Sequence, residues 1–241
     1  MANKDLIALI PARSGSERIP GKNIRYFFGH PLMAYTIKLA TKSGLFREVY
    51  VSSDSEEYLA TATCYGAKPI LRPPEISTSE SPDQLWIEHA LNVVGKSDFA
   101  ILRPTNPFRT IEMLRRACNL YDSECKKNTE ADTYLYLRAV QICKEHPYKM
   151  WENIGSNQLN PAFARDEEYL LQTKCLPAFY VQNGSLEIRP GELYPKNWPL
   201  TYTKTVGFLT QGYEGFDINT EDDCILAEEL VKRGYVELLK L

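Results

Sequence analysis

Short apolar segments alternate with amphipathic segments over the first 139 residues, and this alternation constrains the fold more than any other feature of the chain. Strands are predicted at residues 5–10, 48–51, 68–71, 99–102 and 133–139, and helices at residues 31–41, 55–65, 81–94 and 111–126. Strand–helix repeats of this length predict an α/β fold with a mostly parallel sheet and helices on both faces. Ligands of such sheets bind beyond the carboxyl ends of the strands.

The rhythm breaks between residues 140 and 205. This segment is rich in Pro, Tyr, Trp and Asn and contains only short extended runs. We interpret it as an inserted arm of strands and loops, because its aromatic side chains need burial. The alternative is a flexible loop region. The predicted organisation is therefore a core formed by residues 1–139 and 206–241, closed by a capped helix near residues 220–233, with an inserted arm at 140–205.

The first predicted strand ends in a loop of small and basic residues. Gly15 and Ser16 let backbone N–H groups approach a ligand, and Arg13, Arg18 and Lys22 supply positive charge. A buried strand followed by such a loop is a recurrent way to hold a polyphosphate. The alternative is a basic surface turn after a strand.

The spacing in this loop excludes two common nucleotide motifs. A P-loop needs two glycines five positions apart followed by Lys and Ser or Thr, whereas Gly15 and Gly21 lie further apart and Asn23 follows Lys22. The dinucleotide pattern Gly-x-Gly-x-x-Gly is absent as well.

Composition and charge narrow the class of protein further. The net charge of −3 argues against a nucleic-acid binder. No apolar run approaches the ~18–20 residues that cross a bilayer, and the N-terminal residues lack the apolar core of a signal peptide. We therefore expect a cytoplasmic protein with no membrane or nucleic-acid partner. The six cysteines show no Cys-x-x-Cys, which predicts buried free thiols, and the three histidines show no metal-ligand spacing.

Five blocks along the chain resemble the acylneuraminate cytidylyltransferases, which are CMP-sialic acid synthetases and their relatives acting on other nonulosonic acids. Residues 12–23 resemble the signature Ala-Arg-x-Gly-Ser-x-x-x-x-x-Lys-Asn. The other blocks are Val-Ser-Ser-Asp at 51–54, Leu-Arg-Pro-Pro-Glu at 71–75, Leu-Arg-Pro-Thr-Asn-Pro-Phe-Arg at 102–109 and Phe-Asp-Ile-Asn-Thr-Glu-Asp-Asp at 216–223. The resemblance implies a Rossmann-like nucleotide-diphospho-sugar transferase fold. It also implies that CTP and an acidic sugar react to a CMP-sugar and pyrophosphate.

The resemblance and the loop chemistry agree on a nucleotide site. Arg13 and Lys22 are expected on the phosphates and Asn23 on the ribose, while Arg72 matches the segment that contacts cytosine in the family. The full predicted set for the nucleotide is Ala12, Arg13, Gly15, Ser16, Arg18, Lys22, Asn23, Arg72 and Ser81. Glu17 departs from the family, which usually has Lys there, and Arg18 is expected to replace that cation. The alternative for the segment after Arg72 is a solvated Ser-rich loop.

A magnesium ion is expected between the phosphates and a carboxylate. Asp217 is the candidate ligand and general base, so the predicted catalytic set is Arg13, Lys22 and Asp217. The family commonly presents Asp-x-Asp, whereas the second position here is Asn219. An amide oxygen still ligates a hard cation but adds no charge, which predicts weaker metal binding.

The acceptor site differs most from the family. Val181 stands where the sialate enzymes have Arg, and Arg103 stands where they have Gln. We expect Arg103 to receive an acidic group of the sugar. The other expected acceptor residues are Lys149, Tyr180, Gln182 and Asn183. Legionaminate, pseudaminate or another acidic sugar fits this pattern as well as N-acetylneuraminate.

The resemblance further implies that the arm contributes to the sugar pocket and to a homodimer. Two other functions stay open. One is a nucleotidyltransferase of the same fold that uses another base or a sugar phosphate. The other is a catalytically silent nucleotide-binding regulator, suggested by Glu17 and Asn219.

Overall fold

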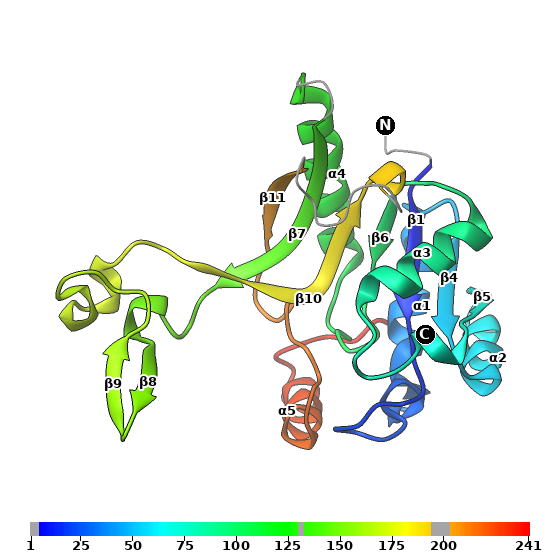
Figure 1. The fold of residues 1–241 in the computed structure, drawn as a ribbon. Helices are drawn as coiled ribbons and strands as arrows, with labels where there is room; N and C mark the ends of the chain where they lie inside the picture. Colours follow the sequence, from blue (N-terminus) through cyan, green and yellow to red (C-terminus); the bar gives the residue numbers. More distant parts are fainter. Residues whose placement is uncertain (1–4, 130–132, 194–202) are drawn as a thin grey trace.

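The computed structural model describes residues 5–129, 133–193 and 203–241. Its centre is a seven-stranded sheet with the strand order β11-β7-β10-β6-β1-β4-β5 (Figure 1). The strands of this sheet are β1 (Ile7–Pro11), β4 (Val49–Ser53), β5 (Lys68–Leu71), β6 (Phe99–Ile101), β7 (Tyr134–Ile142), β10 (Tyr180–Arg189) and β11 (Thr203–Leu209).

The sheet is parallel apart from one strand. β1 pairs in parallel with β4 and β6, β4 with β5, and β7 with β11, whereas β10 runs antiparallel to both of its neighbours. The predicted mostly parallel α/β sheet is therefore confirmed. Because β1, β4, β5 and β6 point the same way, the loops that follow them gather at one edge of the sheet.

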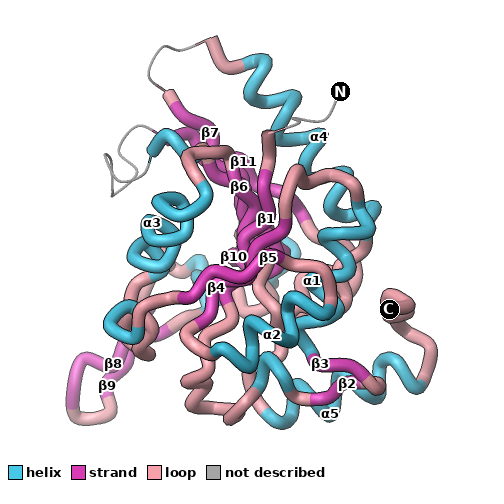
Figure 2. The backbone as a smooth tube through the Cα atoms, turned by 90° about the vertical axis from the view of Figure 1, so that its right-hand side faces the viewer, coloured by secondary structure: helices cyan, strands magenta, loops and turns pink. Residues whose placement is uncertain are grey.

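The described residues form five α-helices: α1 (Leu32–Ser43), α2 (Glu56–Cys64), α3 (Asp83–Val94), α4 (Ile111–Lys127) and α5 (Glu221–Lys232). One apolar core lies between one sheet face and α1, α2 and α4, and α3 packs on the other face over Phe99 and Ile101. Figure 2 shows α3 and α1 on opposite sides of the sheet. α5 packs with the start of α1 in a third cluster around Phe108 and Ile218.

Helix starts follow the local sequence at α2, α4 and α5. The hydroxyls of Ser55 and Thr110 accept the backbone N–H of the residue three positions on, and Thr220 forms a reciprocal capping box with Asp223. The predicted start of α3 at Ser81 is wrong by two residues. The helix begins at Asp83, and the Ser81 hydroxyl bonds Thr78 instead.

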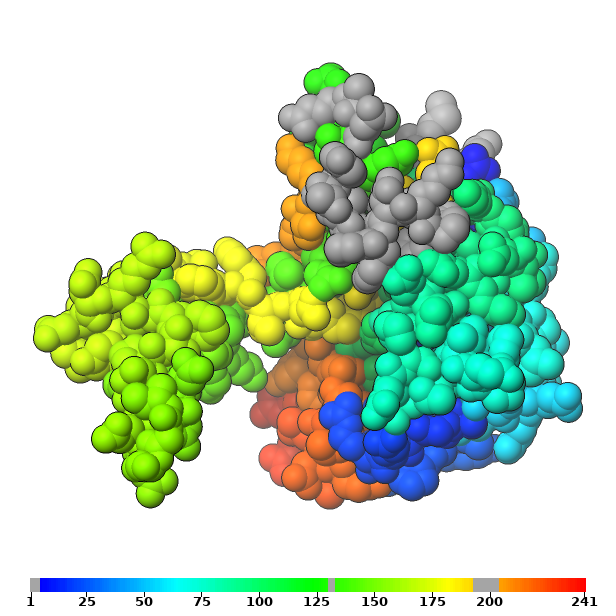
Figure 3. All heavy atoms as spheres, in the orientation of Figure 1, coloured from blue at the N-terminus to red at the C-terminus, as the bar shows by residue number. Residues whose placement is uncertain are grey.

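The chain between β7 and β10 leaves the sheet as a projecting arm, residues 143–179 (Figures 1 and 3). The arm contains a hairpin of β8 (Trp151–Gly155) and β9 (Gln158–Pro161). A smaller hairpin, β2 (Tyr26–Phe27) with β3 (His30–Pro31), lies outside the arm and directly precedes α1 in the chain. The insert expected at 140–205 thus includes β10 and the start of β11, which both belong to the central sheet.

The arm leaves large apolar side chains exposed, among them Trp151, Leu159, Phe163 and Leu170. No helix in the described residues is long and apolar enough to span a bilayer. All six cysteines are free thiols, but the expectation that they are buried is wrong for Cys64, Cys125 and Cys175, which are exposed.

Candidate functional site

The loops at the carboxyl edge of β1, β5 and β6 enclose a cleft of about 410 Å³. Its walls carry five basic and three acidic side chains, so the cleft has an excess of positive charge. The predicted site residues that line it are Arg13, Ser16, Arg18, Lys22, Asn23, Arg72, Ser81, Arg103, Asp217 and Asn219. Segments that are 200 residues apart in the sequence therefore form one site.

The β1 loop (residues 12–23) is anchored at its start by Asp54. The Asp54 carboxylate accepts the backbone N–H of Ser14 at 2.8 Å and its hydroxyl at 2.7 Å. Burial alone would raise the pKa of Asp54, but the bonds from Ser14 outweigh it and lower the pKa. Ala12 is buried beneath the loop, with its N–H bonded to Ser52 of β4, and Gly15 is exposed at the loop tip.

The end of the β1 loop contacts the segment before α5. The Lys22 ammonium donates to the carbonyl of Ile218 at 2.8 Å, and Arg18 donates to the side-chain oxygen of Asn219 at 3.3 Å. Burial lowers the pKa of Lys22, partly offset by Asp217. Asn23 holds the loop from within, because its amide donates to the carbonyl of Arg13 at 3.0 Å.

Asp217 directly precedes the two residues that Lys22 and Arg18 contact, and one of its carboxylate oxygens is bonded while the other is not. Its Oδ2 accepts the Asn219 amide at 2.6 Å, whereas its buried Oδ1 has no hydrogen-bond partner. The backbone on either side is fixed by bonds to the loop after β6, from Asn106 to the carbonyl of Phe216 and from Ile218 to Thr105. An orphaned buried carboxylate oxygen is a position where a hard cation fits.

The described residues contain no cluster of three or more His, Cys, Asp or Glu side chains that would hold a metal ion without help. A cation at Asp217 would therefore need ligands from a substrate. This is the usual situation of Mg²⁺, which binds through one or two carboxylates and substrate phosphates.

Arg72 occupies the wall next to the β1 loop. Its guanidinium is fixed by two bonds to Ser52 at the end of β4 and stacks on the Trp86 ring at 5.4 Å. Burial lowers the pKa of Arg72 to about 10, so the group stays charged at neutral pH.

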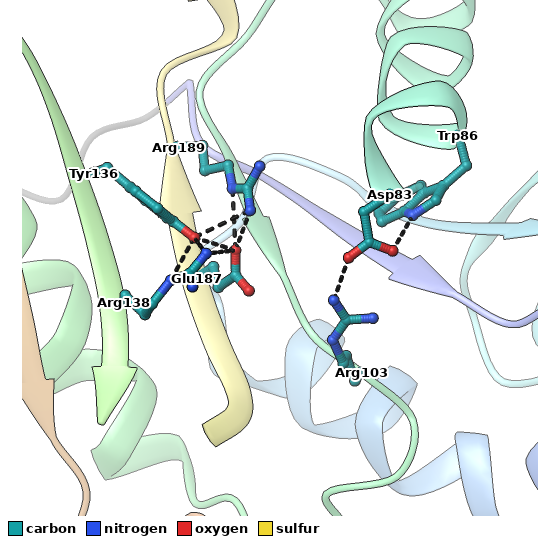
Figure 4. A network of polar contacts seen from close by, with 7 residues as sticks. All are labelled: Asp83, Trp86, Arg103, Tyr136, Arg138, Glu187 and Arg189. Carbon is teal, nitrogen blue, oxygen red and sulfur yellow. Dashed lines mark hydrogen bonds and ion pairs between the residues drawn. The ribbon is translucent and has the colours of Figure 1, made fainter. Parts of the chain in front are cut away.

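Arg103, at the end of β6, forms an ion pair with Asp83 at the start of α3 (Figure 4). Asp83 also accepts the indole N–H of Trp86 at 2.8 Å. Burial alone would lower the pKa of Arg103, but Asp83, and then Glu187 and Asp217, raise it above its ordinary value.

A buried polar network adjoins this ion pair on the same face of the sheet (Figure 4). Tyr136 donates to Glu187 at 2.5 Å, Arg189 donates to the same carboxylate, and Arg138 donates to the Tyr136 hydroxyl at 2.7 Å. Arg138 also lies 3.5 Å from the Glu187 carboxylate, so two guanidinium groups flank it. Burial and the neighbouring carboxylate raise the pKa of Tyr136 to about 12.

Four residues predicted for the acceptor lie outside the cleft in this single chain. Lys149 is in the projecting arm, where its ammonium donates to the carbonyls of Tyr169 and Leu171. Tyr180 and Gln182 are exposed on β10 where it leaves the sheet. Asn183 bonds Ser185 and Thr210 and packs so closely on Gly215 that a Cβ there would lie 2.5 Å from its amide nitrogen.

Three further residues of the site had no predicted role, although Asp54 and Arg109 belong to the sequence blocks expected at this edge of the sheet. Asp54 follows β4 as a polar residue at a strand end, which is a usable sequence signal. Asp83 looks like an ordinary first-turn acid of a helix, and only the fold shows that it meets Arg103. The buried Arg109 bonds the carbonyls of Ser185 and Arg103 and the Thr36 hydroxyl, so it ties β10 to the loop after β6.

The fold and the cleft define an α/β protein with a mainly basic site at the carboxyl edge of its sheet. A solved structure titled CMP:2-keto-3-deoxy-manno-octonic acid synthetase complexed with CTP superposes with a TM-score of 0.68 at 12% identity, over 96% of this chain and 100% of that chain. At this identity the likeness shows the fold.

The family model described as cytidylyltransferase matches residues 7–183, and the chain belongs to this family. The CMP-N,N'-diacetyllegionaminic acid synthase of Legionella pneumophila is 31% identical over 238 residues, with 94% of this chain and 96% of the relative covered. The N-acylneuraminate cytidylyltransferase of Escherichia coli O18:K1:H7 is 43% identical over 119 residues, 49% of this chain but 28% of the relative. The chain thus spans well under two thirds of that relative. The family expected from the five sequence blocks is confirmed.

Proposed function

We propose that this protein transfers CMP from CTP to an acidic nonulosonic sugar and releases pyrophosphate. The observation that carries the proposal is the cleft itself, whose walls bring Arg13, Arg18 and Lys22 together with Asp217. The printed names of relatives from Legionella and Escherichia coli support CTP and a sialic-acid-like acid as substrates.

The triphosphate is proposed to lie along the β1 loop. Backbone N–H groups around Gly15 and Ser16 approach its oxygens, and Arg13, Arg18 and Lys22 offset its charge. This requires Lys22 and Arg18 to turn from their present contacts with residues 218 and 219 to the phosphates. Arg72, fixed beside Trp86, and Ser81 form the wall that would receive the ribose and cytosine, with Asn23 on the ribose side.

The reaction needs a sugar hydroxyl aligned with the α-phosphorus. The hydroxyl oxygen forms a bond to phosphorus as the bond to the bridging oxygen of pyrophosphate breaks, and the hydroxyl proton leaves to a base. Asp217 is the proposed base, because it is a carboxylate that lines the cleft beside the β1 loop, where Arg18 and Lys22 contact the two residues that follow it.

Magnesium is the proposed cofactor. The orphaned oxygen of Asp217 fits a hard cation, and Asn219 would contribute an amide oxygen or orient a water molecule. When bound, Mg²⁺ supplies charge neutralisation at the transferring phosphoryl group.

The acceptor is proposed to lie between Asp217 and Arg103, with its acidic group on Arg103. In the ring form of a 2-keto sugar acid, the carboxylate and the reactive hydroxyl share one carbon, so their binding groups must lie close together. Asp217 and Arg103 line the same cleft and act on each other electrostatically.

A homodimer is proposed to complete the acceptor site. Lys149 and Tyr180 lie outside the cleft of their own chain, and the arm that carries Lys149 exposes Trp151, Leu159 and Phe163. Exposed apolar side chains in this number are typical of an interaction surface. The reaction is proposed to be cytoplasmic, where CTP is made.

The direct test is pyrophosphate release with Mg²⁺ and CTP over a panel of N-acetylneuraminate, N,N'-diacetyllegionaminate, pseudaminate and other keto-deoxy acids. Turnover with one acid supports the proposal and names the acceptor. Preference for GTP, UTP or a sugar phosphate would favour another nucleotidyltransferase. CTP binding without turnover of any acid would favour the silent regulator suggested by Glu17 and Asn219.

Arg103→Gln is expected to raise the KM for the sugar acid far more than the KM for CTP, because it removes the cation proposed for the acidic group. Steady-state kinetics with each substrate varied in turn measure both constants. Equal changes in the two constants would contradict the assignment.

A further inference from the structure

We propose that Asp83 occupies, on Arg103, the place that the carboxylate of the acceptor takes, so that acceptor binding exchanges one ion pair for another. The inference rests on the proposed function, since it assumes an acidic sugar at Arg103. It makes Asp83 a residue that tunes acceptor affinity and selects for an acceptor with a carboxylate at this position.

The ion pair is accessible from the cleft. The side chains of Arg103 and Asp83 are 32% and 38% exposed, and both line the cleft together with Asp217. Figure 4 shows the guanidinium of Arg103 reaching across from the end of β6 to the first turn of α3. A ligand can therefore reach Arg103 without opening the protein core.

Asp83 can give up Arg103 at low cost because it has other partners. Its second oxygen accepts the Trp86 indole N–H at 2.8 Å. Asp83 is also the first residue of α3, where the unpaired backbone N–H groups and the helix dipole favour a negative charge. Arg189 adds positive charge near it.

Arg103 is held in place and has fewer partners. Within the described part of the chain, Asp83 is the only carboxylate in ion-pair contact with its guanidinium. Its aliphatic stem passes Gly184 so closely that a Cβ on Gly184 would lie 3.2 Å from Arg103 Cδ. The β10 backbone thus confines the aliphatic part of the Arg103 side chain. The guanidinium at its end can still exchange one anionic partner for another.

The buried network behind the pair fixes this arrangement. Glu187 favours the charged form of Arg103 but is itself bonded by Tyr136 and Arg189. The carboxylate of Glu187 therefore already has its hydrogen-bond partners within the buried network. Asp83 is the carboxylate that an incoming anion would replace.

The test compares the wild type with Asp83→Asn and Asp83→Glu. In Asp83→Asn the side-chain oxygen can still accept from Trp86, but the charge that competes for Arg103 is gone. We expect the Kd and the KM for the sugar acid to fall about two- to fivefold. A change of this size is expected because the acid no longer has to break one partly exposed ion pair before it binds Arg103. The KM for CTP stays unchanged. Asp83→Glu keeps the competing charge and does not tighten acceptor binding.

The probes are N-acetylneuraminate, N,N'-diacetyllegionaminate and pseudaminate, with binding measured by calorimetry in the presence of CMP and turnover measured by pyrophosphate release. Glu17→Gln is the control, since it removes another carboxylate of the same cleft that does not contact Arg103. It is expected to change the KM for CTP and not that for the acid.

An unchanged or higher Kd for the acid in Asp83→Asn would overturn the exchange, because a residue that only supports Arg103 weakens binding when it is lost. If the wild type turns over an acid but Asp83→Asn does not bind it more tightly, this inference fails alone. If neither protein binds any of the acids, the proposed acceptor class fails with it.

Discussion

At the scale of single residues, Asn219 is the position where this chain departs most clearly from a two-carboxylate metal site. Its amide donates to Asp217 at 2.6 Å and its oxygen accepts from Arg18 at 3.3 Å. Asn219 thus links a cleft cation to the Asp217 carboxylate while adding no charge. Asp217 keeps one oxygen free for a cation, but the side chain of Asn219 adds no second carboxylate beside it.

Asn219→Asp is expected to lower, by roughly severalfold, the Mg²⁺ concentration that gives half-maximal activity. The reason is that ligand charge sets the affinity for a hard cation. Pyrophosphate release over a Mg²⁺ titration at saturating CTP measures the effect. If the Mg²⁺ concentration for half-maximal activity is unchanged, residue 219 neither contacts the ion nor affects its binding electrostatically.

At the scale of elements, the function of the β1 loop depends on its anchor on β4. Two bonds from Ser14 to Asp54 fix the loop where it leaves the sheet. The ionised carboxylate accepts both, so the anchor depends on the charge of Asp54.

Asp54→Asn is expected to lower the free energy of unfolding at pH 7 by about 1 kcal/mol and to raise the KM for CTP. The pKa of Asp54 is lower in the folded chain than its ordinary value of 3.8. Its contribution is therefore complete above that value and is lost as the pH falls through the lower, folded value. Urea unfolding of both proteins at pH 7 and below about pH 4 checks this. A difference between the proteins that persists undiminished in acid would contradict the electrostatic origin.

Elements were predictable from the sequence where local signals and packing agree. The strands around Ile7 and Phe99 and the capped helix after Thr220 follow from apolar runs and caps. The start of α3 was missed because a Ser-Pro pair looks like a cap, whereas Ser81 bonds Thr78. The path of β10 was not predictable either, since it pairs with β6 and β7 from distant parts of the sequence.

The cleft could be predicted only in part, because some of its residues lie in local sequence motifs and others meet only in the folded chain. Arg13, Lys22 and Asp217 carry local motifs, and the parallel sheet brings their loops together. The Asp83–Arg103 pair and the network around Glu187 arise from contacts across the sheet, which no single segment encodes. The local signs of this network were polar residues at alternate positions of two apolar stretches, at 187 and 189 on β10 and at 136 and 138 on β7.

At the scale of the whole molecule, the projecting arm is the feature that a single chain does not explain. Lys149, which lies in the arm, is not among the residues that line the cleft, and the arm exposes Trp151, Leu159 and Phe163. Both facts are accounted for if the arm packs against a second copy of the chain.

Light scattering after size exclusion is expected to give twice the 27.6 kDa mass of the chain. The double variant Trp151→Asp, Phe163→Asp is expected to be monomeric, with its circular dichroism unchanged and a much higher KM for the acid. A monomeric wild type with full activity would contradict the dimeric site.

The central claim is that a sugar acid attacks the α-phosphorus of CTP in the cleft around Asp217. The most direct measurement follows CTP labelled at the α-phosphorus through the reaction with Mg²⁺ and the acid that the panel selects. We predict that the label appears in the CMP-sugar and not in pyrophosphate, and that Asp217→Asn loses this transfer while still folding. Label that remains in CTP, or that appears as free CMP without a sugar attached, would contradict the account.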